Sequence, residues 1–236
     1  MGKGAVVVFS GGIDSTTLLH YVRRDYDEVY GISFYYGQRH KKELQYAIFW
    51  GEELCKEHKI VNISFMREVA NRSALMSDGS EIPKDQHYAR ENQRITVVPN
   101  RNMVLLSIAI AWAENLGIPC VFYGAHRNDF EVYPDCRPEF VEALSRASSL
   151  GTYTQVKVLA PFVNMTKAEI VKLGLKLGVD YSLTWSCYEG GERPCLRCAT
   201  CAERTFSFLE NGVKDPLLTD DEWERAVEIC RKVFNL

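Results

Sequence analysis

Short apolar, β-branched runs alternate with stretches of helical period along most of the chain. The runs predict strands over residues 5–9, 29–34, 60–65, 95–98, 121–123 and 156–159. Between them, apolar positions recur at helical spacing over residues 15–24, 41–57, 103–115, 138–150 and 166–177. This β-α-β-α rhythm predicts an α/β fold with an open, mostly parallel sheet that is covered by helices on both faces.

Two segments depart from this rhythm. Residues 219–234 begin with Thr219 and Glu222 at capping-box spacing and carry apolar side chains on one face, which predicts a closing helix that packs on the body. Residues 71–92 are polar and show no clean period. They fit a mobile loop that covers a site, and a surface excursion without a role fits them equally well.

The composition predicts a globular protein with one main domain and a small appendage. The chain has 236 residues, of which 46% are hydrophobic and 25% are charged, and this suffices for one substantial core. Its net charge of −3 provides no general field to gather a polyanion, so nucleic acid is not the expected partner. The apolar run at the N-terminus is far too short for a membrane span and has no cleavage site, so we expect a cytoplasmic protein without a membrane partner.

Four of the eight cysteines lie within 15 residues near the C-terminus, at the spacing C-x7-C-x2-C-x2-C: Cys187, Cys195, Cys198 and Cys201. A reducing compartment disfavours a disulfide framework, and four thiolates at this spacing suit one tetrahedral, structural zinc ion. An iron–sulfur cluster is the alternative. We favour zinc because the fourth cysteine lies upstream and no proline follows Cys201.

The loop after the first predicted strand has the composition of a phosphate site. It reads Ser10-Gly11-Gly12-Ile13-Asp14-Ser15, and a helix follows. The glycines let the backbone approach a phosphate, and the amides at a helix N-terminus point at it with the positive end of the helix dipole. The lysine of a Walker A loop and the G-x-G-x-x-G pattern of dinucleotide sites are both missing. A glycine turn capped by Asp14 or Ser15 is the structural alternative.

A second candidate phosphate contact is Lys167. It lies in the first turn of a predicted helix that opens with the capping-box sequence Thr166-Lys167-Ala168-Glu169. A cation is poorly placed there for the helix dipole. A bound anion would resolve that conflict, although a solvated lysine explains the position equally well.

The S-G-G-x-D-S loop resembles the pyrophosphate loop of ATP pyrophosphatases, enzymes that transfer AMP to a substrate oxygen and release pyrophosphate. Together with the cysteine cluster it resembles the QueC family of 7-cyano-7-deazaguanine synthases. The likeness runs from Phe9 to about Arg204 and includes V-P-N-R-N at residues 98–102, G-A-H at 124–126, Y-P-D-C-R-P-E-F at 133–140 and S-C-Y-E-G-G at 186–191. One departure is Leu196, where the family commonly has glycine.

The resemblance implies a fold of the adenine nucleotide alpha-hydrolase-like (HUP) type, with an ATP-binding domain over residues 1–180 and a zinc-binding helical lobe over residues 181–236. It implies a homodimer that converts 7-carboxy-7-deazaguanine and ammonia, with ATP, into 7-cyano-7-deazaguanine through adenylated intermediates. Mg²⁺ would accompany ATP, and one structural Zn²⁺ would occupy the cysteine cluster. The catalytic residues would be Asp14, Ser15 and Lys167. The implied ATP contacts are Phe9, Ser10, Gly11, Gly12, Ile13, Asp14, Ser15, Thr16, Thr17, Leu18 and Leu19.

Recognition of a guanine-like acid requires a carboxylate at its amino edge and a cation at its carboxyl group. Ligands of open α/β sheets bind outside the carboxyl ends of the strands. The predicted loops at that edge carry the candidates Arg101, Asp129, Glu131, Asp135 and Arg137. Surface salt bridges explain the same residues nearly as well, and His126 is interpreted as a structural loop histidine.

Two other functions fit part of the sequence. A tRNA-modifying enzyme of the same pyrophosphate-loop type would adenylate a base, but the isoelectric point of about 6.0 and the lack of a basic tail argue against it. A nucleotide-binding module without catalysis would bind ATP and release no pyrophosphate with any acid. No glutaminase domain fits beside the predicted one, so free ammonia or a separate donor would supply the nitrogen.

Overall fold

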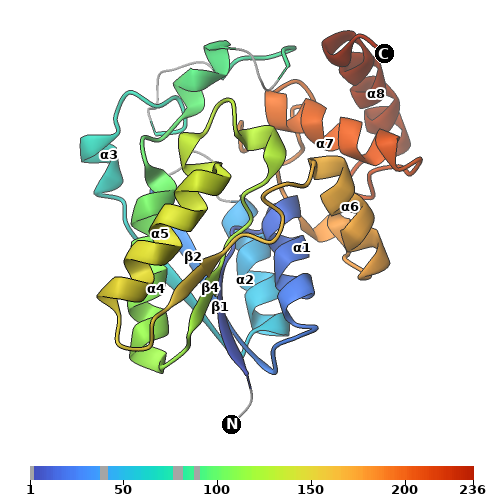
Figure 1. The fold of residues 1–236 in the computed structure, drawn as a ribbon. Coiled ribbons are helices and arrows are strands. Elements are labelled where there is room, and N and C mark those ends of the chain that lie inside the picture. The colour runs from blue at the N-terminus through green and yellow to red at the C-terminus, as the bar shows by residue number, and fades with distance from the viewer. Residues whose placement is uncertain (1–2, 38–41, 77–81, 88–90) are drawn as a thin grey trace.

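The structure is a computed structural model that describes residues 3–37, 42–76, 82–87 and 91–236, and Figure 1 shows its fold. The described strands form one sheet: β1 (Gly4–Val8), β2 (Glu28–Tyr35), β3 (Glu57–Asn62), β4 (Cys120–Phe122) and β5 (Lys157–Leu159). All neighbouring strands pair in parallel, in the order β3-β2-β1-β4-β5. The predicted open parallel sheet is confirmed.

Helices cover both faces of this sheet. α1 (Ile13–Val22) and α2 (Lys42–Leu54) lie on one face, and α4 (Arg101–Leu116) and α5 (Pro138–Gly151) lie on the other. Val7 of the central strand belongs to the buried cluster that contains Leu18 of α1, whereas Val6 belongs to the cluster that contains Leu106 of α4. A strand that is buried on both faces therefore has the continuous apolar sequence seen at β1.

One predicted strand is wrong. In place of a strand at residues 95–98, the segment Glu91–Thr96 forms a 3-10 helix, and Val98 is buried in the cluster beside α4. The run is apolar because it packs against the core, and periodicity alone cannot separate such a run from a buried strand. The third strand also begins earlier than predicted, at Glu57, and α2 ends at Leu54. Lys41, the predicted start of that helix, lies outside the described residues.

The C-terminal region consists of α6 (Lys167–Lys176), α7 (Ala199–Glu210) and α8 (Asp220–Phe234). The predicted closing helix is confirmed by α8, whose capping box joins Thr219 and Glu222. α7 is not among the predicted helices, and it packs between α6 and α8. Short turns complete the described helices: α3 (Met66–Val69) and the 3-10 turns Arg127–Asp129, Pro134–Cys136 and Tyr181–Leu183.

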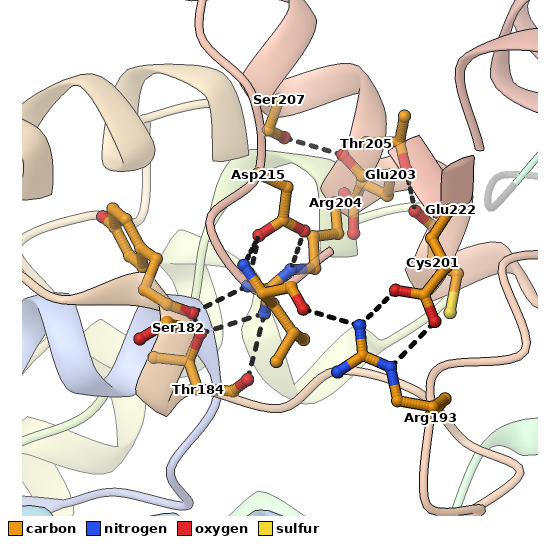
Figure 2. Close-up of polar contacts among 12 residues, drawn as sticks. Ser182, Thr184, Arg193, Cys201, Glu203, Arg204, Thr205, Ser207, Asp215 and Glu222 are labelled. Carbon is orange, nitrogen blue, oxygen red and sulfur yellow. Dashed lines mark hydrogen bonds and ion pairs between the residues drawn. The ribbon is translucent and has the colours of Figure 1, made fainter. Parts of the chain in front are cut away.

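A buried ion pair holds α7 in place (Figure 2). The Arg204 guanidinium donates from Nε to Asp215 Oδ2 at 2.6 Å and from Nη2 to Asp215 Oδ1 at 2.8 Å. It also donates to the Tyr181 carbonyl at 2.9 Å and to the Thr184 hydroxyl at 2.9 Å. Both charged side chains are buried, with 4% of Arg204 and 0% of Asp215 exposed. The pair therefore ties α7 to the segment that precedes the cysteine cluster.

By length and composition alone, one of the described segments, Gln93–Leu116, is apolar enough to cross a membrane. It contains α4, which packs on β1 and β4 and buries Leu105, Leu106 and Ala109. The core helix of a globular protein passes the same test, so this segment is weak evidence for a membrane span.

Candidate active site

A cavity of about 270 Å³ opens at the carboxyl edge of the sheet. β1 pairs with β2 on one side and with β4 on the other, so the chain order reverses next to β1. Such a switch point is where open α/β sheets bind ligands. The cavity is lined by the ends of β1, β2 and β4, by the loops that follow them, and by the first turns of several helices.

The loop after β1 packs tightly against α2 at Gly11, a residue that does not itself line the cavity. Gly11 has φ +87°, and a Cβ there would lie 2.3 Å from the Glu43 carbonyl oxygen, so only glycine fits. Gly12 is the N-cap of α1 and provides no side-chain cap. Trp185 N donates to Gly11 O at 3.0 Å, which fixes the loop from the C-terminal side of the chain. The amides at the start of α1 are thus available to a ligand.

The structure divides the predicted ATP contacts into two groups. Residues at the loop line the cavity: Phe9, Ser10, Gly12, Ile13, Asp14 and Ser15. Deeper in α1, the following residues are fully buried and do not line it: Thr16, Thr17, Leu18 and Leu19. The Thr17 hydroxyl, for example, lies 2.8 Å from the hydroxyl of Tyr181.

Among the described helices, several have their first turn at the cavity. The lining includes Ile13 of α1, Arg101 of α4, Lys167 of α6 and Ala199 of α7, each in the first turn of its helix. Each N-terminus carries a partial positive charge. Their convergence favours an anionic ligand, such as the phosphates of a nucleotide.

A chain of ion pairs crosses the cavity wall. Lys167 Nζ lies 3.2 Å from Asp14 Oδ2 and 2.7 Å from Glu203 Oε2. His126 Nε2 lies 3.5 Å from Asp14 Oδ2 and 3.4 Å from Asp129 Oδ2. Asp14 therefore shares Lys167 with the Glu203 carboxylate and shares His126 with the Asp129 carboxylate.

These contacts determine the charges of the site. Burial by itself would lower the pKa of the His126 imidazole, but the carboxylates of Asp129 and Asp14 raise that pKa to about 9. Burial would likewise raise the pKa of the Asp14 carboxyl, yet Lys167 and His126 hold it below its ordinary value. The pKa of Lys167 is raised by Asp14 and Glu203 against the effect of burial. At neutral pH the wall thus carries two cations beside ionised Asp14.

Arg101 faces the same cavity among tyrosines. Its Nη1 donates to Tyr36 Oη at 3.1 Å, and its guanidinium carbon lies 5.3 Å from the centre of the Tyr36 ring. Tyr133 and Tyr188 also line the cavity, with their hydroxyls 3.3 Å apart. Among the described residues, no carboxylate lies within ion-pair distance of Arg101. Its remaining donors are available to an acid.

The other substrate candidates differ in where they lie. Asp129 lines the cavity, whereas Asp135 is buried behind it and accepts a hydrogen bond from Asn102 N at 2.8 Å. That carboxylate caps α4 from a distant part of the chain and so orients the turn that carries Arg101. Arg137 and Glu131 line a separate surface pocket.

The four clustered cysteines meet in space. Their sulfur atoms all lie within 4.8 Å of one another, and Cys195 Sγ is 4.0 Å from Cys201 Sγ. Tetrahedral Zn–S bonds of about 2.3 Å would place sulfurs about 3.8 Å apart. Cys195 N donates to Cys187 Sγ and Cys198 N donates to Cys195 Sγ, both at 3.3 Å. Such amide–sulfur bonds stabilise thiolates, so this group fits a metal ion.

The described parts of segment 71–92 lie against the cavity and the cysteine cluster. Leu75 lines the cavity. Ile82 is buried in one cluster with Trp185 and Cys187, and Lys84 forms a β-bridge with Cys198. These parts of the segment are therefore packed against the body, and both hypotheses, a covering loop and an excursion without a role, stay predictions. Residues 77–81 and 88–90 lie outside the described residues.

Comparison with known proteins identifies the family. The sequence model of a family described as "Queuosine biosynthesis protein QueC" matches residues 4–212. The chain belongs to the QueC family. A 7-cyano-7-deazaguanine synthase of Archaeoglobus fulgidus is 54% identical over 97% of this chain and 95% of that protein. Those of Caldicellulosiruptor saccharolyticus (54% identity; 90% of this chain, 94% of that protein) and Psychromonas ingrahamii (44% identity; 94% of this chain, 100% of that protein) are also similar.

The departure from the QueC pattern at Leu196 has a structural explanation. Leu196 has φ +63°, a left-handed conformation in which glycine has no steric penalty. Its side chain is 5% exposed and packs in one cluster with Leu218 and Ala226 of the C-terminal region. Burial of a leucine side chain is worth about 1.5–3 kcal/mol, which exceeds a left-handed backbone cost of roughly 1–2 kcal/mol.

Proposed function

We propose that this QueC protein is an ATP-dependent 7-cyano-7-deazaguanine synthase, an enzyme that forms a nitrile from 7-carboxy-7-deazaguanine and ammonia. The observation that carries the proposal is the cavity at the switch point of the sheet, where the Ser10–Ser15 loop at the start of α1 lies beside Lys167 and His126. The names of the similar proteins support it.

The reaction requires two activations of oxygen. The substrate carboxylate attacks the α-phosphorus of ATP and pyrophosphate leaves; ammonia then displaces AMP from the acyl carbon and loses a proton, which gives an amide. The amide oxygen attacks a second ATP, pyrophosphate leaves again, and loss of AMP and of both amide protons forms the nitrile. The protein needs no covalent nucleophile, because charge stabilisation and alignment suffice for each step.

The residues of the cavity fit this work. We assign the pyrophosphate to the Ser10–Ser15 loop, the α1 amides and Lys167, since each places positive charge where negative charge develops. Asp14 Oδ1 is buried with no hydrogen-bond partner among the described residues, so it has a free oxygen for Mg²⁺. Magnesium bound with ATP would neutralise phosphate charge.

For the second substrate we assign Arg101 to the carboxyl group and Asp129 to the amino edge of the heterocycle. Both side chains line the cavity, and Arg101 keeps donors that no carboxylate of the described chain occupies. Tyr36, Tyr133 and Tyr188 would flank a flat ring. Asp135 is then a residue that positions Arg101 through α4.

The decisive test of the function is the bond of ATP that breaks. Incubation with 7-carboxy-7-deazaguanine, ammonia and MgATP is expected to yield AMP and pyrophosphate, about two of each per nitrile, because both oxygens leave as adenylates. Ion-exchange separation of the nucleotides measures this ratio. ADP and phosphate would contradict the assignment of the loop even if nitrile formed. With ammonia omitted, labelled pyrophosphate should exchange into ATP.

The metal of the cysteine cluster is proposed to be zinc. Freshly purified protein is expected to contain one zinc per chain by elemental mass spectrometry, because four thiolates close a tetrahedral site. Cys201→Ser should lose the metal, whereas Cys230→Ser, at a buried cysteine outside the cluster, should keep it. Less than about half an equivalent of zinc, or stoichiometric iron, would contradict the one-site zinc assignment.

The remaining assignments follow the family resemblance. We propose a homodimer in the cytoplasm that uses free or delivered ammonia and binds no nucleic acid. We also propose that residues 1–180 form the ATP-binding domain and residues 181–236 the zinc lobe. Analytical ultracentrifugation of the metal-loaded protein tests the dimer.

A further inference from the structure

Lys167 is a cation of the phosphate cavity that is held from the C-terminal helices. Its side chain is 8% exposed, and its ammonium lies between Asp14 of the phosphate loop at 3.2 Å and Glu203 of α7 at 2.7 Å. A buried lysine has a flexible stem, so the position of its ammonium depends on its partners. The shorter of its two ion pairs is the one with Glu203.

Glu203 comes from a rigid part of α7. Cys198 is the N-cap of α7, and Cys201 lies in its first turn, so the metal cluster anchors the start of the helix. The next residue after Glu203 is Arg204, whose guanidinium is bound by Asp215, Tyr181 and Thr184 (Figure 2). Glu203 therefore sits between two anchors on a helix that has little freedom to shift.

Glu203 is itself oriented toward the cavity. Its side chain is 5% exposed in the Lys167 ion pair, and the residue belongs to the cavity lining. Oε2 contacts Lys167, while Oε1 is buried without a hydrogen-bond partner among the described residues. Burial of a carboxylate with one oxygen unpaired is costly, and a purely structural pair would satisfy both oxygens more cheaply.

We propose that Glu203 is a positioning residue, which holds the Lys167 ammonium over the phosphate loop and thereby makes the metal-bound lobe part of the ATP site. Glu203 acts through Lys167 and touches no reacting atom. The inference rests on the proposed function, because it assigns Lys167 to the pyrophosphate that leaves. It predicts that the length of the side chain at position 203 matters as well as its charge.

Glu203→Asp separates positioning from mere charge neutralisation. Aspartate keeps the negative charge beside Lys167 but is one methylene shorter, so it draws the ammonium toward α7 or loses contact with it. A displacement of about 1 Å can cost up to ~100-fold in rate. We expect kcat at least about tenfold lower, with KM for ATP changed less than about threefold, and with zinc content and thermal midpoint close to those of the wild type. Glu210→Asp, at the exposed end of α7, is the matched control and should change none of these.

A second variant pair keeps the inference testable if Glu203→Asp folds poorly. Glu203→Gln should lower kcat strongly in the wild-type background. In a Lys167→Met background the same substitution should lower kcat by less than about threefold, because the effects of substitutions at two contacting residues that act together do not add. If the double variant loses kcat by the product of the two single losses, Glu203 does not act through Lys167 and the positioning role is wrong. A folded, zinc-loaded Glu203→Asp protein with wild-type kcat would also overturn that role.

Pyrophosphate binding distinguishes a failure of this inference from a failure of the proposed function. Calorimetry with pyrophosphate and Mg²⁺ needs no nitrile formation, and Glu203→Asp is expected to raise the Kd about fivefold or more because Lys167 leaves the loop. If the wild type makes no nitrile, the proposed function fails while this measurement still tests Glu203. An unchanged Kd in the folded variant would contradict the positioning of Lys167.

Discussion

Asp14→Asn is expected to lower kcat/KM by roughly 10²–10³-fold, the usual effect of removing one preorganised charged or polar contact from a reacting group. Asp14 is the carboxylate that both cations of the cavity wall share. Without its charge, Lys167 and His126 lose their common partner at the phosphate loop, and Mg²⁺ loses an anionic ligand.

The stability of this variant should change little. Lys167 keeps its ion pair with Glu203 at 2.7 Å, and His126 keeps Asp129 at 3.4 Å, so neither cation is left unpaired. A loss of about 1 kcal/mol would shift the thermal midpoint of a chain of this size by about 2–4 °C. Steady-state kinetics and a thermal scan measure the two effects. Asp25→Asn, at an exposed position beyond α1, is the control, and near-normal activity of a folded Asp14→Asn protein would remove Asp14 from the mechanism.

Asp215→Asn is expected to lower the free energy of unfolding by about 3–5 kcal/mol, the usual effect of breaking a buried ion pair. Asp215 is fully buried, and its two oxygens receive Arg204 Nε and Nη2 as well as Leu217 N at 3.0 Å. Asparagine offers one acceptor oxygen and places an NH₂ group against the guanidinium. The Arg204 charge would then be buried without compensation (Figure 2).

Urea unfolding followed by circular dichroism tests this prediction. Asp220→Asn is the matched control, because it removes an aspartate ion pair in the same region whose carboxylate side chain is 91% exposed. Exposed ion pairs contribute about 0–1 kcal/mol to the free energy of unfolding, so this free energy should be nearly the same in the control as in the wild type. If the two substitutions lower the free energy of unfolding equally, burial of the Arg204–Asp215 ion pair does not determine how much this pair stabilises the protein.

Features that depend on contiguous residues were predictable from the sequence. The loop from Ser10 to Ser15 follows a strand and opens a helix, so adjacent residues alone are enough to predict an anion site there. The cysteine spacing brings its sulfurs together within one short segment, as the structure confirms. The parallel sheet followed from runs that are apolar on both faces.

Contacts between distant segments were not predictable. Glu203 could not be assigned from the sequence, because its partner Lys167 lies on another helix. The three tyrosines around Arg101 were missed for the same reason, and Asp135 was taken for a substrate contact although it caps α4.

The sequence by itself determined the glycine loop between β1 and α1, the cluster of four cysteine thiols and the class of sheet, since local backbone geometry and burial leave a period or a spacing in the chain. Only the tertiary structure decided which carboxylates surround Lys167 and His126 and that residues 95–98 are no strand. Those outcomes depend on how helices and loops pack across the sheet, and packing partners separated by tens of residues leave no periodic trace in a single sequence.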